Sequence, residues 1–202
     1  MDKTYIDELL KYGEHIALEC KKAEGGVPKS IWETYSAFAN TNGGTIILGV
    51  EEDFQADNWD DRFSVLGVHN PENIVKDFWN TINSDKVNAC ILKDENVQIV
   101  EYDKQINVVV IQVPQAAYNI KPVYINGNVY KGTFKRNFEG DYHCEEGEVK
   151  AMIRDANEDG NDGNIVEYYT MDDIDVTTLK NYRNEFENHN IGHFYNQLDD
   201  KE

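Results

Sequence analysis

The sequence predicts an α+β domain with a mixed β-sheet of about five or six strands and helices packed on it. One observation is a helix that leads through a double glycine into an apolar strand, between residues 31 and 50. A second is a pair of apolar strands at residues 97–102 and 106–113, and a third is an amphipathic helix at residues 70–82. Together these patterns indicate helices that pack on a sheet.

The stretch from Ser36 to Asp53 organises the rest of the chain. Apolar residues recur at helical spacing up to position 39, and Asn42-Gly43-Gly44 then supplies the positive φ angles that a tight reversal needs. Residues 45–50 are apolar without alternation, which is typical of a strand covered on both faces. The strand is followed by three acidic residues, 51–53, so we expect it to bring carboxylates to one end of the sheet.

Shorter patterns predict the remaining elements. Asn70 and Pro71 predict a capped helix start, and Asn126-Gly127 predicts the two-residue turn of a hairpin between residues 123 and 131. The other expected elements are helices at 5–12, 146–156 and 177–188, a strand at 15–21 and a short apolar segment at 63–68.

The charge is unevenly distributed along the 202 residues. The net charge is −19, and residues 1–140 hold 14 Lys or Arg against 21 Asp or Glu, whereas residues 141–202 hold 5 against 17. Such acidity argues against binding of nucleic acid over the whole surface, although one face could still be basic. We expect a domain at 1–156 and an acidic linker with a helical extension at 157–202, which ends where a further helix would begin, as in a truncated longer chain.

Other features of the sequence limit the class of protein. The three cysteines, Cys20, Cys90 and Cys144, have neither metal-site nor disulfide spacing, so we expect reduced thiols. The sequence has no apolar run of membrane-spanning length and no signal-peptide pattern, which predicts a cytoplasmic protein without membrane contact. It also has no G-x-x-x-x-G-K-[ST] motif, so nucleotide hydrolysis is not expected.

Three segments together resemble the Schlafen-type AlbA domain family. The stretch SAFANTNGGTIILGV from Ser36 is similar to that family's helix end and "GV" strand, and Glu19-Cys20-Lys21 is similar to its E-F-K strand. The segment YKGTFKRNFEGDYHC, residues 130–144, is similar to the stretch that closes bacterial members. The resemblance implies the nucleic-acid-binding domain of a bacterial-type transcriptional regulator, which needs no cofactor and could pair as a homodimer.

Carboxylates form the first candidate site. Glu14, Glu19 and the Glu51/Asp53 strand end could hold a divalent cation, although the spacing of Glu14 and Glu19 does not place them on one face. The resemblance implies that Glu14, Glu19 and Glu51 match the metal ligands of Mg²⁺- or Mn²⁺-dependent ribonucleases in the family, with Glu51 where Asp is commoner. The alternative is that these acids solvate strand ends or pair with nearby lysines.

Basic residues form the second candidate site, a set of phosphate contacts for DNA or RNA. Aromatic residues among them, Tyr124, Tyr130, Phe134 and Phe138, could stack on bases or belong to the core. A third interpretation is a protein-interaction module that uses the acidic tail. The expected phosphate contacts are Lys21, Lys22, Lys131, Lys135 and Arg136.

Overall fold

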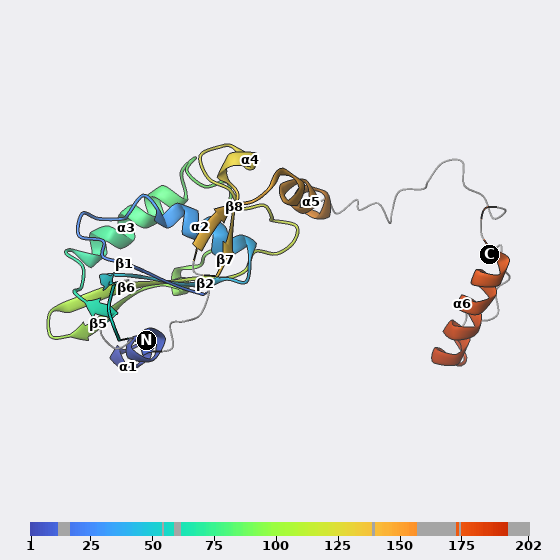
Figure 1. Ribbon diagram of the computed structural model, residues 1–202, viewed down its shortest axis with the longest axis horizontal. Coiled ribbons are helices and arrows are strands. Elements are labelled where there is room, and N and C mark those ends of the chain that lie inside the picture. The colour runs from blue at the N-terminus through green and yellow to red at the C-terminus, as the bar shows by residue number, and fades with distance from the viewer. Residues whose placement is uncertain are drawn as a thin grey trace. The chain divides into compact units, whose positions relative to one another are not determined.

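A computed structural model describes residues 1–11, 17–53, 55–58, 62–138, 140–156, 173 and 175–193. The chain divides into two compact units, Met1–Glu158 and Asp159–Glu202. The first unit contains, in order, α1 (Lys3–Lys11), β1 (Leu18–Lys21), α2 (Ile31–Asn40), β2 (Gly44–Leu48), β3 (Val50–Glu52), β4 (Phe63–Val65), α3 (Pro71–Ile82), the 3₁₀ turn η2 (Asp94–Asn96), β5 (Val97–Asp103), β6 (Ile106–Val113), α4 (Val129–Gly132), β7 (Phe134–Asn137), β8 (Gly140–His143) and α5 (Glu146–Ala156) (Figure 1).

The predicted α+β class with a mixed sheet is confirmed. The main sheet has four strands in the order β1-β2-β6-β5, in which β1 pairs parallel to β2 and the other pairs are antiparallel. The remaining strands do not extend this sheet but form two separate two-stranded sheets, β3-β4 and β7-β8.

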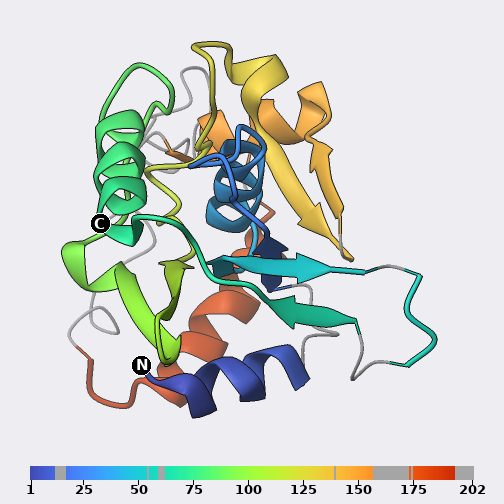
Figure 2. The ribbon, with the colours of Figure 1, turned by 90° about the vertical axis from the view of Figure 1, so that its left-hand side faces the viewer.

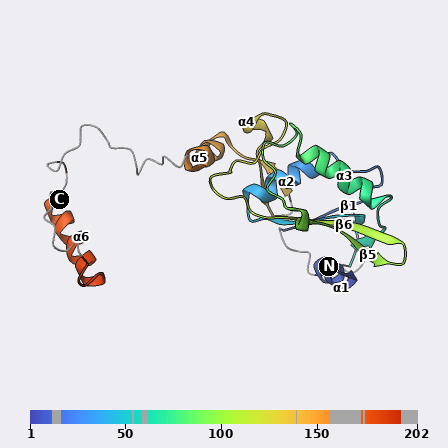
Figure 3. The same ribbon diagram turned by 180° about the vertical axis from the view of Figure 1, so that it is seen from behind.

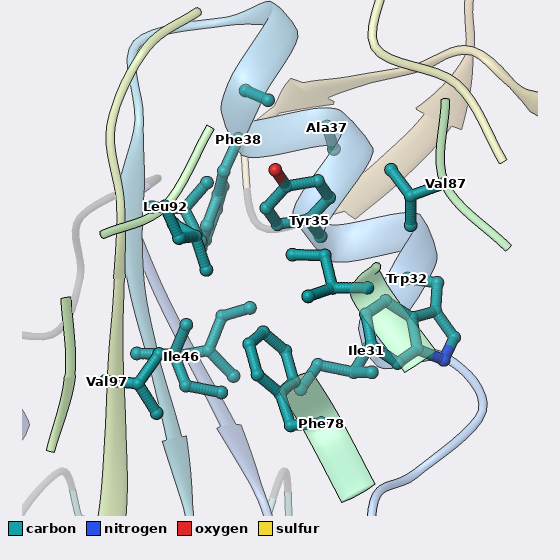
Figure 4. Close-up of a cluster of buried hydrophobic side chains, with 14 of the residues drawn as sticks. Ile31, Trp32, Tyr35, Ala37, Phe38, Ile46, Phe78, Val87, Leu92 and Val97 are labelled. Carbon is teal, nitrogen blue, oxygen red and sulfur yellow. The ribbon is translucent and has the colours of Figure 1, made fainter. Parts of the chain in front are cut away.

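Helices cover both faces of the main sheet. Helices α2 and α3 lie on one face and α1 lies on the other (Figure 3). Because strand side chains alternate, Ile46 and Leu48 of β2 enter the core under α2 and α3, whereas Ile47 enters the core under α1. In the larger core Trp32 of α2 stacks on Phe78 of α3 with ring centroids 5.3 Å apart (Figure 4). Strand β2, which was predicted to be covered on both faces, is therefore covered on both faces.

Gly49 divides the strand that was predicted at residues 45–50. Its φ is +102°, a backbone conformation that residues with a side chain rarely adopt. A Cβ there would also lie 2.9 Å from the backbone of Gly67, so a side chain has no space. Its N–H donates to Lys21 O and its carbonyl accepts from Leu66 and Gly67. The chain thus leaves the main sheet at Gly49, and Val50 starts β3 in the β3-β4 pair.

The predicted hairpin at residues 123–131 is wrong in its second arm. The Asn126-Gly127 turn is present, with φ of +58° and +66°. The residues after it form the short helix α4, because the Asn128 side chain accepts the N–H groups of Tyr130 and Lys131 and caps a helical turn. Asn70, in contrast, precedes α3 without any side-chain capping bond.

The three thiols are free, as predicted, and differ in reactivity. Cys20 and Cys144 are buried, and burial is the main cause that raises the pKa of each thiol, to about 11 for Cys144. Cys90 is exposed. Since only the thiolate attacks disulfides, we expect one fast-reacting thiol per native chain with Ellman's reagent and two more after unfolding in guanidinium. Two fast thiols, or a fast thiol in a Cys90→Ser variant, would contradict this accessibility.

The second unit contains the predicted C-terminal helix, α6 (Val176–His189). The Asp175 side chain caps it by accepting the Thr178 N–H at 2.7 Å. The beginning of the predicted linker, from residue 157, and the further helix start expected at the end of the chain lie outside the described residues. Within the described ranges, no helix is long and apolar enough to cross a membrane.

Candidate functional site

Side chains of α2 hold the strand β7 as a neighbouring strand would. The Ser36 hydroxyl accepts the Phe134 N–H at 3.0 Å, and the Asn40 amide donates to Phe134 O at 3.0 Å. Thr41, just after the helix, accepts the Arg136 N–H at 2.9 Å. The N–H and carbonyl of Phe134 are therefore bonded to side chains of α2 and the N–H of Arg136 to the residue after it, while β7 pairs with β8 on its other side. This explains in physical terms why Ser, Asn and Thr occur at these spacings.

Asn40 also ties down the segment before α4. Its amide donates to Val123 O at 2.8 Å and its carbonyl oxygen accepts the Val123 N–H at 2.8 Å. The hydroxyl of Ser36 donates to the same Val123 carbonyl at 2.7 Å. Asn40 and Ser36 are buried, so these bonds replace water completely. Side chains of α2 thus bond both ends of the segment from Val123 to Phe134.

Four charged side chains form a chain of ion pairs where the β7-β8 hairpin meets β1. Lys21 Nζ lies 2.8 Å from Glu19 Oε1, and Arg136 Nη2 lies 2.9 Å from Glu19 Oε2. Arg136 Nη1 lies 2.8 Å from Asp141 Oδ1, and the Thr34 hydroxyl donates to the other oxygen of Asp141 at 2.7 Å. Two cations and two anions alternate, so this network carries no net charge.

Arg136 is the centre of the network. Its side chain is only 4% exposed, its Nη2 also donates to Leu18 O at 3.0 Å, and its guanidinium lies 5.1 Å from the centre of the Phe38 ring. A planar guanidinium can serve several acceptors and an aromatic face at once, which a lysine cannot. The structure therefore gives this residue an internal position, between the hairpin, α2 and β1.

The described carboxylates do not fit a metal site. Glu14 lies outside the described residues. Both oxygens of Glu19 bind cations of the protein itself, and Glu51 pairs with Lys22 at 2.9 Å. Within the part of the chain that the structure describes, no three His, Cys, Asp or Glu residues form a group that could hold an ion. The pairing with lysines that the sequence left open as the alternative is present at Glu19 and Glu51.

Two of the three predicted phosphate contacts outside this ionic network are also paired. Lys22 contacts Glu51 and Glu24, and these hydrogen bonds raise the pKa of its ammonium. Lys135 lies 2.6 Å from Glu148, which likewise raises the pKa of Lys135. Lys131 is exposed and has no ion pair with any described residue. The predicted phosphate contacts therefore offer little unpaired positive charge to a phosphate.

The aromatic residues divide into core and surface groups. Phe134 is 5% exposed and packs on His143 with centroids 4.3 Å apart, so it belongs to the core, and Tyr124 is partly buried. Tyr130 is 46% exposed and Phe138 75% exposed. Sequence reasoning missed Tyr142, which is 55% exposed on β8. The strand β8 itself was not predicted, and recognising residues 134–143 as a hairpin would have placed this ring outside.

A surface pocket of about 650 Å³ lies beside the end of α3. It was not predicted, because residues from two segments far apart in the sequence, 82–90 and 124–127, line it. The Asn88 side chain there already bonds the backbone of Pro122 and Tyr124, and the Asn83 amide bonds Trp79 O. These amides are engaged within the protein, which weakens the case for a ligand site. The lining is Ile82, Asn83, Ser84, Asp85, Val87, Asn88, Cys90, Tyr124 and Gly127.

Comparison with known proteins identifies the family of the chain. The family model described as Schlafen, AlbA_2 matches residues 14–145, which is more than half of the chain. The protein therefore has a Schlafen AlbA_2 domain, and the chain belongs to that family, as its sequence predicted. A second model, described as Domain of unknown function (DUF8451), matches residues 150–202.

One solved structure is similar to the first unit. It is the solution structure of the N-terminal domain of a RecG-related protein from Nitrosomonas europaea, named as a candidate ATP-dependent DNA helicase. The two chains are 26% identical, the TM-score is 0.52, and the match covers 70% of this chain and 92% of the other. No curated protein matches the chain significantly.

Proposed function

We propose that the Schlafen AlbA_2 unit binds nucleic acid as the recognition domain of a regulatory protein. The observation that supports this is the family match over residues 14–145, together with the similarity to the N-terminal domain of a RecG-related protein named for DNA helicase activity. Helicase activity itself is not proposed, since the chain has no phosphate-binding loop for ATP.

The proposed phosphate contacts are the exposed Lys131 and the half-buried Lys22 and Lys135 of the predicted set. Lys22 and Lys135 would exchange Glu51 and Glu148 for a phosphate, so each gains little net electrostatic energy. Lys21 and Arg136 would reach a phosphate only by releasing Glu19. We therefore expect modest affinity and a shallow dependence on salt, because few counterions are released.

The test is fluorescence anisotropy with labelled single-stranded and duplex DNA and RNA, in about 50 and about 200 mM salt. We expect binding at the lower salt concentration, and Lys131→Glu should weaken it and lower the salt slope by about one. Lys104→Glu makes the same charge change at an exposed turn and should have little effect. Absence of binding to every nucleic acid at low salt would refute the proposal.

A cleavage assay tests the ribonuclease interpretation, which no contact among the described residues favours. Labelled RNA would be incubated with Mg²⁺ or Mn²⁺, with and without a chelator. Cleavage that stops with chelator would assign a metal-dependent nuclease. Glu19→Gln alone would not be enough, because this change also breaks the ion pairs with Lys21 and Arg136.

A further inference from the structure

The tip of the β7-β8 hairpin carries an aromatic residue that the fold does not use. Phe138 follows β7, has a φ of +54° and is 75% exposed. A bulky residue in the left-handed region is disfavoured, and a turn usually places Gly, Asn or Asp there. Phe138 belongs to neither hydrophobic core cluster, so the protein gains no core packing in return for this conformation. Such an arrangement is typical of a residue kept for contact with a ligand.

A second ring lies on the same end of the hairpin. A Cβ built on Gly140 would meet two ring carbons and the hydroxyl oxygen of Tyr142 at 2.6 to 2.8 Å, so the hydroxyl end of the Tyr142 ring lies over the Gly140 backbone. Gly140 is paired with Asn137 in the last pair before the turn. The absence of a side chain at Gly140 thus lets a 55% exposed ring lie flat at the tip. Figure 2 shows the two strands side by side, β7 in gold and β8 in orange.

The cations of the hairpin are already neutralised. Lys135 pairs with Glu148, and Arg136 pairs with Glu19 and Asp141 inside the protein. Phosphate attraction at this hairpin is therefore weak, whereas two exposed rings provide stacking surfaces. Each base has a face that can stack on an aromatic ring, but in a duplex the neighbouring base pairs cover both faces. Only unpaired bases can use such a surface without disrupting a helix.

We propose that the tip of the β7-β8 hairpin binds unpaired bases of single-stranded nucleic acid by stacking on Phe138 and Tyr142. This inference rests on the proposed function and specifies its ligand. Binding should prefer single strands to duplexes and tolerate different sequences, because stacking depends on the ring face and not on hydrogen-bonding edges.

The test compares a labelled oligonucleotide of about 12 thymidines with a blunt duplex of mixed sequence, since single-stranded sites span roughly 4–16 nucleotides. Phe138→Ala and Tyr142→Ala should each weaken binding to the single strand about tenfold. Tyr142→Phe keeps the ring and should bind as the unchanged protein does. Tyr118→Ala is the matched control, because it removes a 66% exposed ring outside the hairpin.

Phe138→Gly separates stacking from folding. Glycine adopts positive φ without strain, so this variant should melt at the same temperature as the unchanged protein or higher, and still bind single strands about tenfold more weakly. If single strands and duplexes bind equally and Phe138→Ala changes neither, the inference is wrong and the proposed function stands. If neither nucleic acid binds at low salt, the proposed function fails as well.

Discussion

Replacing Asn40 by alanine is expected to lower the free energy of unfolding by about 3 kcal/mol, because it leaves two buried backbone groups without partners and opens a cavity. The Asn40 side chain serves Val123 N–H, Val123 O and Phe134 O, all at 3.0 Å or less. Ser36 can still bond Val123 O and Phe134 N–H, so the loss falls on the remaining two groups and on the cavity. Urea denaturation followed by circular dichroism measures the effect.

Two further variants test whether the lost hydrogen bonds cause this destabilisation. Asn40→Asp keeps an acceptor for Val123 N–H but cannot donate to the two carbonyls, so it should be at least as destabilising as alanine. Asn73→Ala replaces an exposed asparagine of α3 and should change stability by less than about 0.5 kcal/mol. A loss below about 1 kcal/mol for Asn40→Ala would mean that β7 is held mainly by its pairing with β8.

The helices and central strands could be predicted from the sequence because their patterns are local. The spacing of Ile74, Phe78 and Ile82 gives one apolar face, and these residues are buried as that spacing requires. Likewise, Val108-Val109-Val110-Ile111 is a continuous apolar run, and it lies in the central strand β6. Periodicity is enough where burial alone determines the element.

Elements determined by single polar contacts could not be predicted in this way. The capping carbonyl of Asn128 turns an expected strand into α4, and Gly49 ends β2 because Gly67 comes close to it from another segment. The sequence identified Arg136 as a basic residue near aromatics but could not show that the hairpin folds back on β1. Charge indicates which groups a residue can bind, whereas long-range topology determines which of them it reaches.

Replacing Arg136 by methionine is expected to cost about 3–5 kcal/mol of unfolding free energy, because it removes one partner from a buried ionic network. Glu19 would keep Lys21, but Asp141 would keep only the Thr34 hydroxyl among the bonds described here. The comparison is Lys150→Met, which breaks an exposed i,i+4 pair with Glu146 and should leave the free energy of unfolding almost unchanged. Urea denaturation of both variants measures the difference.

Neutralising the remaining partners decides what Arg136 does. In a variant that combines Arg136→Met with Glu19→Gln and Asp141→Asn, no unpaired charge remains in the network apart from Lys21, so most of the lost stability should return. If that stable variant binds nucleic acid as the unchanged protein does, Arg136 positions the hairpin and does not contact phosphate. Arg136→Met could instead leave stability unchanged, weaken binding and lower the salt slope. The Arg136 guanidinium would then leave Glu19 and bind the phosphate of the ligand.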